Sequence, residues 1–122
     1  MNRLNIIARH KRFVLDVVGL CDSLPKGYSY GVFARQLIRS SGSVGANYRA
    51  AGRGKSTADF INKLKIVEEE ADESCYRLDL IGELKSVNIN ESKRLLKEAE
   101  EILAITFAAI KTAKARKSNI KH

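Results

Sequence analysis

Residues 39–48 of the chain read RSSGSVGANY, a run of small and polar residues inside an otherwise helical pattern. Around this run, residues that would share one helix face recur at steps of four and three: Phe33, Leu37, Ser40, Val44, Asn47 and Ala51. After residues 52–54 the same steps recur in Phe60, Leu64, Val67, Ala71, Ser74, Leu78 and Ile81. Such spacing is typical of the facing seams of packed helices. The run therefore predicts two antiparallel helices of a bundle, with small and polar side chains along their shared seam.

The remaining sequence predicts two further helices, which makes an all-α protein. We expect helices over residues 4–24, 30–51, 57–85 and 90–115. Pro25 ends the first helix, because proline disfavours helical geometry in the preceding residue. Ser56 or Thr57 caps the third and Asn90 the fourth, whereas residues 117–122 are expected to fray. Short connections between four helices favour an antiparallel up-down-up-down four-helix bundle, formed as a single domain by all 122 residues.

Composition narrows the class of protein. The sequence is 44% hydrophobic and 30% charged, which is typical of an ordered globular chain. No apolar run approaches the roughly 20 residues of a membrane span, and the first residues lack the pattern of a signal peptide. Cys21 and Cys75 match no metal or redox spacing. We therefore expect a cytoplasmic protein without membrane contact, in which both cysteines are small buried side chains.

The net charge of +8 is unevenly distributed along the chain. Residues 25–58 carry six basic and no acidic residues, and residues 88–122 carry eight basic and four acidic ones. Residues 59–87 carry four basic and eight acidic residues. A basic protein attracts polyanions through the release of counterions, without any base-reading element. The charge pattern therefore favours nucleic acid as a partner.

Several of these cations are candidate phosphate ligands. The expected phosphate-binding residues are Arg35, Arg49, Arg53 and Lys55, with Lys114, Arg116 and Lys117 adding to the positive field. Tyr48 lies among the first group and could stack on a base. The alternative is an ordinary solvated helix face, together with the usual preference for cations at a helix C-terminus.

The polar run also predicts an internal network. Its members are Arg39, Ser40, Ser43 and Asn47, with Glu70 and Glu73 on the next helix as partners. Because buried polar groups must be hydrogen-bonded, we expect the first four to be largely buried and bonded to the third helix. Glycine lowers the stability of a helix interior, so Gly42 and Gly45 indicate that another helix or a ligand approaches the backbone there. Close helix packing is one interpretation, and a ligand pocket at Gly42, Gly45 and Asn47 is the other.

No motif for catalysis or metal binding is found. Residues 54–56 read GKS, but a phosphate-binding loop would need a glycine at position 49, which is arginine, and a preceding strand. The acidic cluster at 68–73 lacks the histidine partners of a di-metal bundle, since the chain contains only His10 and His122. We expect no metal, no cofactor and no enzymatic activity.

The apolar stripes of the first and fourth helices are wider than one bundle core needs. The first stripe is widened by Ile7, Val14, Val18 and Cys21, and the fourth is widened by Leu95, Ile102 and Phe107. Excess apolar surface usually marks an interface, so we expect the protein to self-associate.

Three stretches carry a resemblance to a known family. They are RSxxSVxxNYR at 39–49, ADFIxKL at 58–64 and ExADESxYxL at 69–78. They resemble the four-helix-bundle proteins called 23S rRNA intervening-sequence proteins, and the resemblance extends over nearly the whole chain. Two positions depart from the pattern. Residues 50–52 read AAG where the family usually has an acidic residue, and Arg77 replaces a large aromatic residue.

The resemblance implies a left-handed up-down bundle that assembles into a ring, with a homopentamer as the expected size. It also implies relatedness to accessory proteins of diversity-generating retroelements, which bind nucleic acid and a reverse transcriptase. Family members are often encoded within ribosomal RNA genes, which makes RNA the preferred ligand and a reverse transcriptase a partner by analogy only. No catalytic residue carries over. The alternatives are an assembly module without nucleic-acid binding and a small-molecule-binding bundle.

Overall fold

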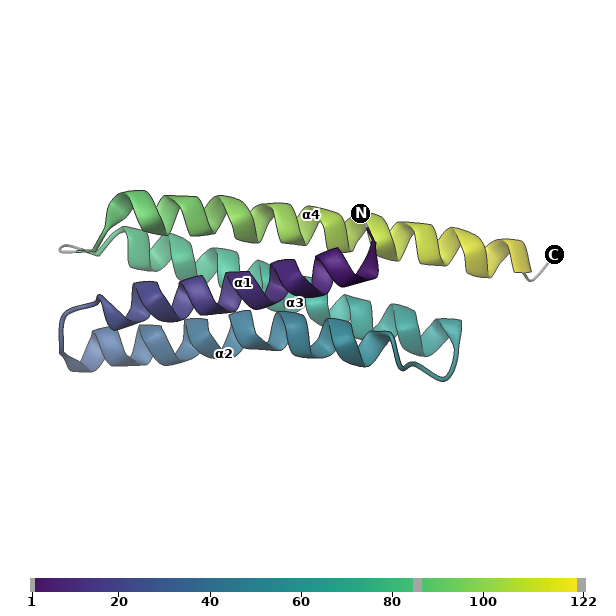
Figure 1. Cartoon of the computed structure of the whole chain (residues 1–122), viewed down its shortest axis with the longest axis horizontal. Coiled ribbons are helices and arrows are strands. Elements are labelled where there is room, and N and C mark those ends of the chain that lie inside the picture. The colour runs from purple at the N-terminus through teal and green to yellow at the C-terminus, as the bar shows by residue number, and fades with distance from the viewer. Residues whose placement is uncertain (1, 85–86, 121–122) are drawn as a thin grey trace.

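The computed structural model describes residues 2–84 and 87–120 of the chain. These residues form four α-helices and no strand, which confirms the all-α class. The helices are α1 (Arg3–Asp22), α2 (Tyr28–Ala51), α3 (Thr57–Gly82) and α4 (Ile89–Ile120). Figure 1 shows them side by side along the long axis of the molecule. None of these helices is both long and apolar enough to cross a membrane.

Side chains cap the N-termini of α3 and α4. Of the two predicted caps of α3, Ser56 and Thr57, the structure has Ser56, whose hydroxyl accepts a hydrogen bond of 3.1 Å from the Asp59 amide. Asn88, rather than the predicted Asn90, accepts from the Glu91 amide, so α4 begins one residue early. The fourth helix continues past its predicted end at residue 115 and reaches residue 120, so it includes the first part of the expected tail.

The other predicted ends differ by small amounts. The first helix stops two residues early, at Asp22, and the second begins two residues early, at Tyr28. The third ends at Gly82, while its predicted end at residue 85 lies outside the described residues. The last two positions of the predicted tail, 121 and 122, also lie outside them.

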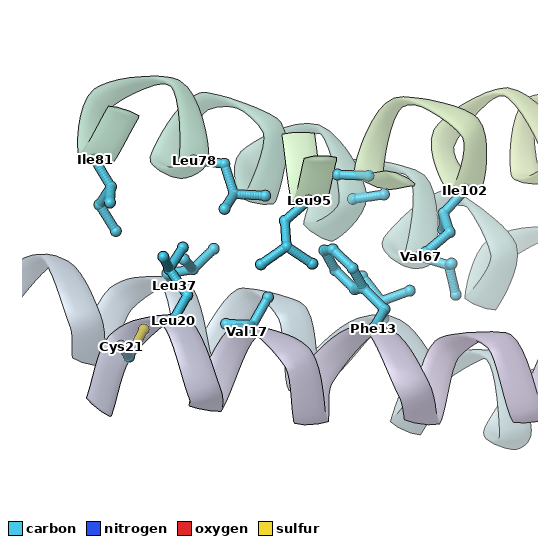
Figure 2. Packing of buried hydrophobic residues seen from close by; sticks show 13 residues of the cluster. Phe13, Val17, Leu20, Cys21, Leu37, Val67, Leu78, Ile81, Leu95 and Ile102 are labelled. Atoms are coloured by element: carbon cyan, nitrogen blue, oxygen red, sulfur yellow. The ribbon is translucent and has the colours of Figure 1, made fainter. Parts of the chain in front are cut away.

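The main hydrophobic core receives side chains from every helix of the described chain. Figure 2 shows Phe13 and Val17 of α1 directed toward Leu95 and Ile102 of α4, with Leu37 of α2 beside them. Each of these side chains is at most 1% exposed. Removing a side chain of this size from water stabilises the fold by about 1.5–3 kcal/mol. Most of the predicted apolar stripe residues therefore meet in this core.

A smaller hydrophobic cluster lies where α1 no longer covers the bundle. It consists of Ala51, Ile61, Leu64, Ile110 and Ala113, with Phe60 and Ala109 packed against it. Figure 1 shows α4 continuing well past the N-terminus of α1. We call this part of the molecule the basic end; it comprises residues 52–56, the first turns of α3 and the last turns of α4.

The two glycines of the polar run face α1. A Cβ atom added at Gly45 would lie 3.3 Å from Cβ of His10, and one added at Gly42 would lie 3.8 Å from Val14. A contact of 3.3 Å is tighter than usual, so Gly45 allows α1 to approach closely. Helix packing therefore accounts for these glycines without a ligand.

Candidate nucleic-acid interface

The polar seam joins α2 to α3 through two serines. The Ser40 and Ser74 hydroxyl oxygens are fully buried and lie 2.9 Å apart, within hydrogen-bond distance. Ser40 also donates to the Leu37 carbonyl at 3.2 Å. Both hydroxyls are therefore satisfied inside the core, as buried polar groups must be.

Two other members of the predicted network behave differently. Asn47 donates from Nδ2 to the Ser43 carbonyl at 2.9 Å, within its own helix, so the expected bond to α3 is wrong. Asn47 and Ser43 are both only half-buried. Their contribution is local to α2 and does not fix how α2 docks on α3.

Arg39 lies on the surface, and the expectation that it is buried is wrong. Its side chain is 55% exposed, while its guanidinium group reaches Glu70 at 3.0 Å and Glu73 at 2.6 Å. Hydrogen bonding from Arg39, followed by that from Arg77, lowers the pKa of Glu73. Arg39 therefore joins α2 to α3 at the surface, through ion pairs with both expected partners, Glu70 and Glu73.

Within residues 2–84 and 87–120, every ion pair is formed by an arginine that lies outside the basic end. These arginines are Arg9, Arg39, Arg77 and Arg94, and their partners are Asp16, Glu70, Glu73, Glu91, Glu98 and Glu101. None of the cations of the basic end takes part in an ion pair within these ranges. Their charges therefore face solvent.

The basic end carries grooves on two sides of α4. One groove, of about 330 Å³, is lined by Lys65 and Asn62 of α3 and by Lys114 and Lys117 of α4. The other, of about 500 Å³, is lined by Arg116 of α4 and by residues at the start of α3, including Ser56 and Phe60. Cations of both helices therefore converge, although α3 and α4 are distant in sequence.

The structure brings together most of the predicted phosphate-binding residues. Lys114, Arg116 and Lys117 line the two grooves. Arg53 and Lys55 are exposed in the connection, and Lys55 directly precedes Ser56, a lining residue.

Two predicted cations differ from the rest in position. Arg49 is exposed in the last turn of α2, next to the connection. Arg35 lies 14 residues earlier on α2, about 21 Å away along the helix axis. Arg35 is therefore not part of the basic end.

Tyr48 is not available as a stacking platform. Its ring is half-buried against both hydrophobic clusters and meets the His10 ring edge-on, with centroids 5.0 Å apart. The Arg3 guanidinium carbon lies 5.9 Å from the ring centroid. Burial raises the pKa of the Tyr48 hydroxyl. The prediction that Tyr48 stacks on a base is therefore replaced by a packing role.

His10 sits beneath this ring and carries no charge near neutral pH. It is 3% exposed, and its Nδ1 atom has no hydrogen-bond partner. Burial, helped by the neighbouring Arg9, lowers the pKa of His10 to about 4. His10 therefore adds nothing to the positive field of the surface.

Sequence reasoning missed Lys65, which lines the first groove with Lys114 and Lys117. The signal lies in the helical period, because Leu64 belongs to the buried stripe of α3 and Lys65, next to it, is exposed. The pairing with Lys114 depends on how α3 and α4 are aligned, which the heptad-like steps do not specify.

Two other kinds of site, a metal centre and a reactive thiol, find little support among the described side chains. Across residues 2–84 and 87–120, no three His, Cys, Asp or Glu residues are placed to hold a metal ion. His122 lies outside these ranges. Burial raises the pKa of Cys21 and of Cys75 to about 11, so both remain thiols near neutral pH.

Comparison with known proteins gives two findings. The sequence model of a family described as 23S rRNA-intervening sequence protein matches residues 2–108. A similar solved structure is that of a Bacteroides thetaiotaomicron protein of unknown function from the S23 ribosomal protein family. It is 31% identical, with a TM-score of 0.79, and the match covers 87% of this chain and 98% of that one. No curated protein matches the sequence.

Proposed function

The chain belongs to the 23S rRNA-intervening sequence protein family, and from this premise we propose that it binds nucleic acid without catalysing a reaction. The proposed ligand is RNA, bound through its phosphates with low sequence specificity by a self-associating bundle. The family description itself names ribosomal RNA, which favours RNA over DNA. The short connections further support a single domain whose successive helices run up and down.

One observation carries the proposal: the unpaired cations of the basic end. The ion pairs of the described ranges neutralise arginines elsewhere, whereas Lys65, Lys114 and Lys117 converge on one groove with no acidic lining residue. After Glu101, α4 contains no acidic residue and four basic ones. Binding at this groove therefore breaks none of these ion pairs, and a phosphate backbone supplies the anions that the lysines lack.

The two grooves support contact with more than one phosphate. Lys114 and Lys117 line one groove, and Arg116 lines the other. A strand crossing the end of α4 could therefore meet cations on both sides of the helix. No aromatic ring with a free face lines the first groove, so affinity should come from phosphates rather than from stacked bases.

The test is a salt-titrated binding assay with the triple variant Lys65→Ala, Lys114→Ala, Lys117→Ala. We expect weaker binding to structured RNA and a salt slope flattened by about 2 to 3 units, since each lost phosphate contact removes ~0.7–0.9. The matched control replaces Lys26, Lys93 and Lys97, which are exposed and lie outside the basic end. The control should leave both affinity and slope nearly unchanged.

Two results would contradict the proposal. If the unmodified protein fails to bind RNA at low salt, the basic end is only a solvated surface and the assembly-module alternative gains support. If the triple variant and its control lose affinity equally, the protein's net charge rather than the basic end attracts RNA. Running single-stranded and duplex DNA in parallel tests the preference for RNA.

A further inference from the structure

A third groove between α3 and α4 has a different character from the basic end. Leu103, Ala104 and Phe107 form its apolar floor, and its volume is about 770 Å³. Phe107 is 61% exposed, which is unusual for so large an apolar side chain. The rim carries Glu68, Glu69, Asp72 and Glu100. We call this feature the acidic groove.

The rim carboxylates lack cationic partners. Glu70 and Glu73 of the same helix are paired with Arg39, but in the described part of the chain none of the four rim residues takes part in an ion pair. An apolar floor surrounded by unpaired acids is complementary to an apolar surface that carries cations.

The outer face of α1 provides such a surface. Leu4 is 74% exposed and Leu15 is 55% exposed. Ala8, Lys11 and Leu15 follow at steps of four, three and four from Leu4, so they share one face of the helix. Arg12 borders this face. Lys11 and Arg12 take part in no ion pair among residues 2–84 and 87–120, and residues 3–15 contain no acidic residue.

We propose that the outer face of α1 of one copy docks into the acidic groove of a second copy, which gives the self-association of the proposed function a definite pair of surfaces. Leu15 would cover Phe107, while Lys11 and Arg12 meet the rim acids.

The pairing joins unlike surfaces, so a docked pair leaves the groove of one copy and the α1 face of the other free. Among the described residues α1 runs next to α2 and α4 and diagonally across the bundle from α3, whereas the acidic groove opens on the side formed by α3 and α4. Because the two surfaces lie on different sides of the bundle, one two-fold contact cannot bury both of them in each copy. Such an assembly either closes into a ring or continues as a chain.

Lys65, Lys111 and Lys114 border the neighbouring depression, toward the basic end. Phe107, Glu68 and Glu69 line this depression as well, so the charge changes from negative to positive along a single surface of α3 and α4. The cations of α1 would be repelled there and confined to the acidic groove. The basic end consequently remains open to a polyanion after docking.

Charge reversal tests the pairing. Light scattering coupled to gel filtration would compare the unmodified protein with Lys11→Glu, Arg12→Glu and with Glu69→Lys, Asp72→Lys. We expect each variant to weaken self-association by about 100-fold, because like charges would face each other. Combining all four substitutions in one chain should restore assembly at least 10-fold. The control Lys93→Glu, Lys97→Glu should assemble as the unmodified protein does.

The outcomes separate this inference from the proposed function. If both charge-reversed variants assemble normally, the pairing is overturned, but the proposal of nucleic-acid binding is not affected. Failure of the fourfold variant to assemble has the same two consequences. A monomeric unmodified protein overturns self-association as well, whereas the salt titration of the basic end is unaffected. Phe107→Ser serves as a second variant. Its site is exposed, so it should retain its circular dichroism spectrum and lose assembly; unchanged assembly would also overturn the pairing.

Discussion

Replacing Arg39 with alanine removes two ion pairs that join α2 to α3 from outside. The guanidinium group lies 3.0 Å from Glu70 and 2.6 Å from Glu73, so the geometry is favourable. The Arg39 side chain, however, is 55% exposed, while its partners are 16% and 30% exposed. Ion pairs in such a setting contribute about 0.2–1 kcal/mol each, whereas breaking a buried pair costs about 3–5 kcal/mol.

We therefore expect Arg39→Ala to lower the free energy of unfolding by about 1 kcal/mol, which corresponds to roughly 4 °C in Tm. Urea denaturation followed by circular dichroism measures the change. Arg35→Ala is the matched control, because Arg35 is exposed on the same helix and takes part in none of the ion pairs of the described ranges. A double-mutant cycle with Glu73→Gln isolates the coupling between Arg39 and Glu73.

The effect also depends on pH in a defined direction. Arg39 lowers the folded-state pKa of Glu73, so the stabilisation is present above the unfolded pKa of about 4.3 and is lost as pH falls through the folded value. The difference between the two proteins should shrink below pH 4. A loss above 3 kcal/mol at pH 7 would refute the reasoning, since it would mean that Glu70 stays buried without its partner. A loss unaffected by 1 M salt would contradict it equally.

Two further predictions concern the interior. His10→Leu should make the free energy of unfolding less dependent on pH. The folded protein keeps His10 neutral down to about pH 4, whereas the unfolded chain protonates it near pH 6.5. In urea titrations the unmodified protein should therefore lose up to about 3 kcal/mol more stability than the variant between pH 7 and pH 4. Ser74→Ala should cost about 1 kcal/mol, because it leaves the buried Ser40 hydroxyl without its inter-helix partner, whereas Ser74→Ala in a Ser40→Ala background should cost less.

The helices were predictable because local patterns determine them. Leu64 and Leu78 follow the steps of a buried stripe, and both are at most 1% exposed. Ser56 is an N-cap in the structure as in the prediction, because its position before a helical pattern is decided within a few residues. Near residue 90 two asparagines compete, and the prediction chose the second where Asn88 forms the cap.

The candidate site was less predictable because it depends on side-chain length and helix alignment. Arg39 was expected inside, yet its long side chain places the guanidinium group at the surface while its two glutamate partners remain the expected ones. Tyr48 was expected outside, yet the approach of α1 covers its ring with His10. Lys65 and Lys114 share a groove only because α3 and α4 align there, and no short sequence pattern specifies that alignment.

The two hydrophobic clusters give the molecule two regions of unequal resistance to opening. The small cluster of Ala51, Ile61, Leu64, Ile110 and Ala113 lies where α4 has passed the start of α1, and it buries far less apolar surface than the main core. Amide hydrogens of the basic end should therefore exchange with solvent through partial openings that leave the main core closed. A polyanion held by the lysines on α3 and α4 would tie the two helices together and slow that exchange. Binding at this end would therefore be measured as slower amide exchange in the smaller cluster, while the exchange rates in the main core stay the same.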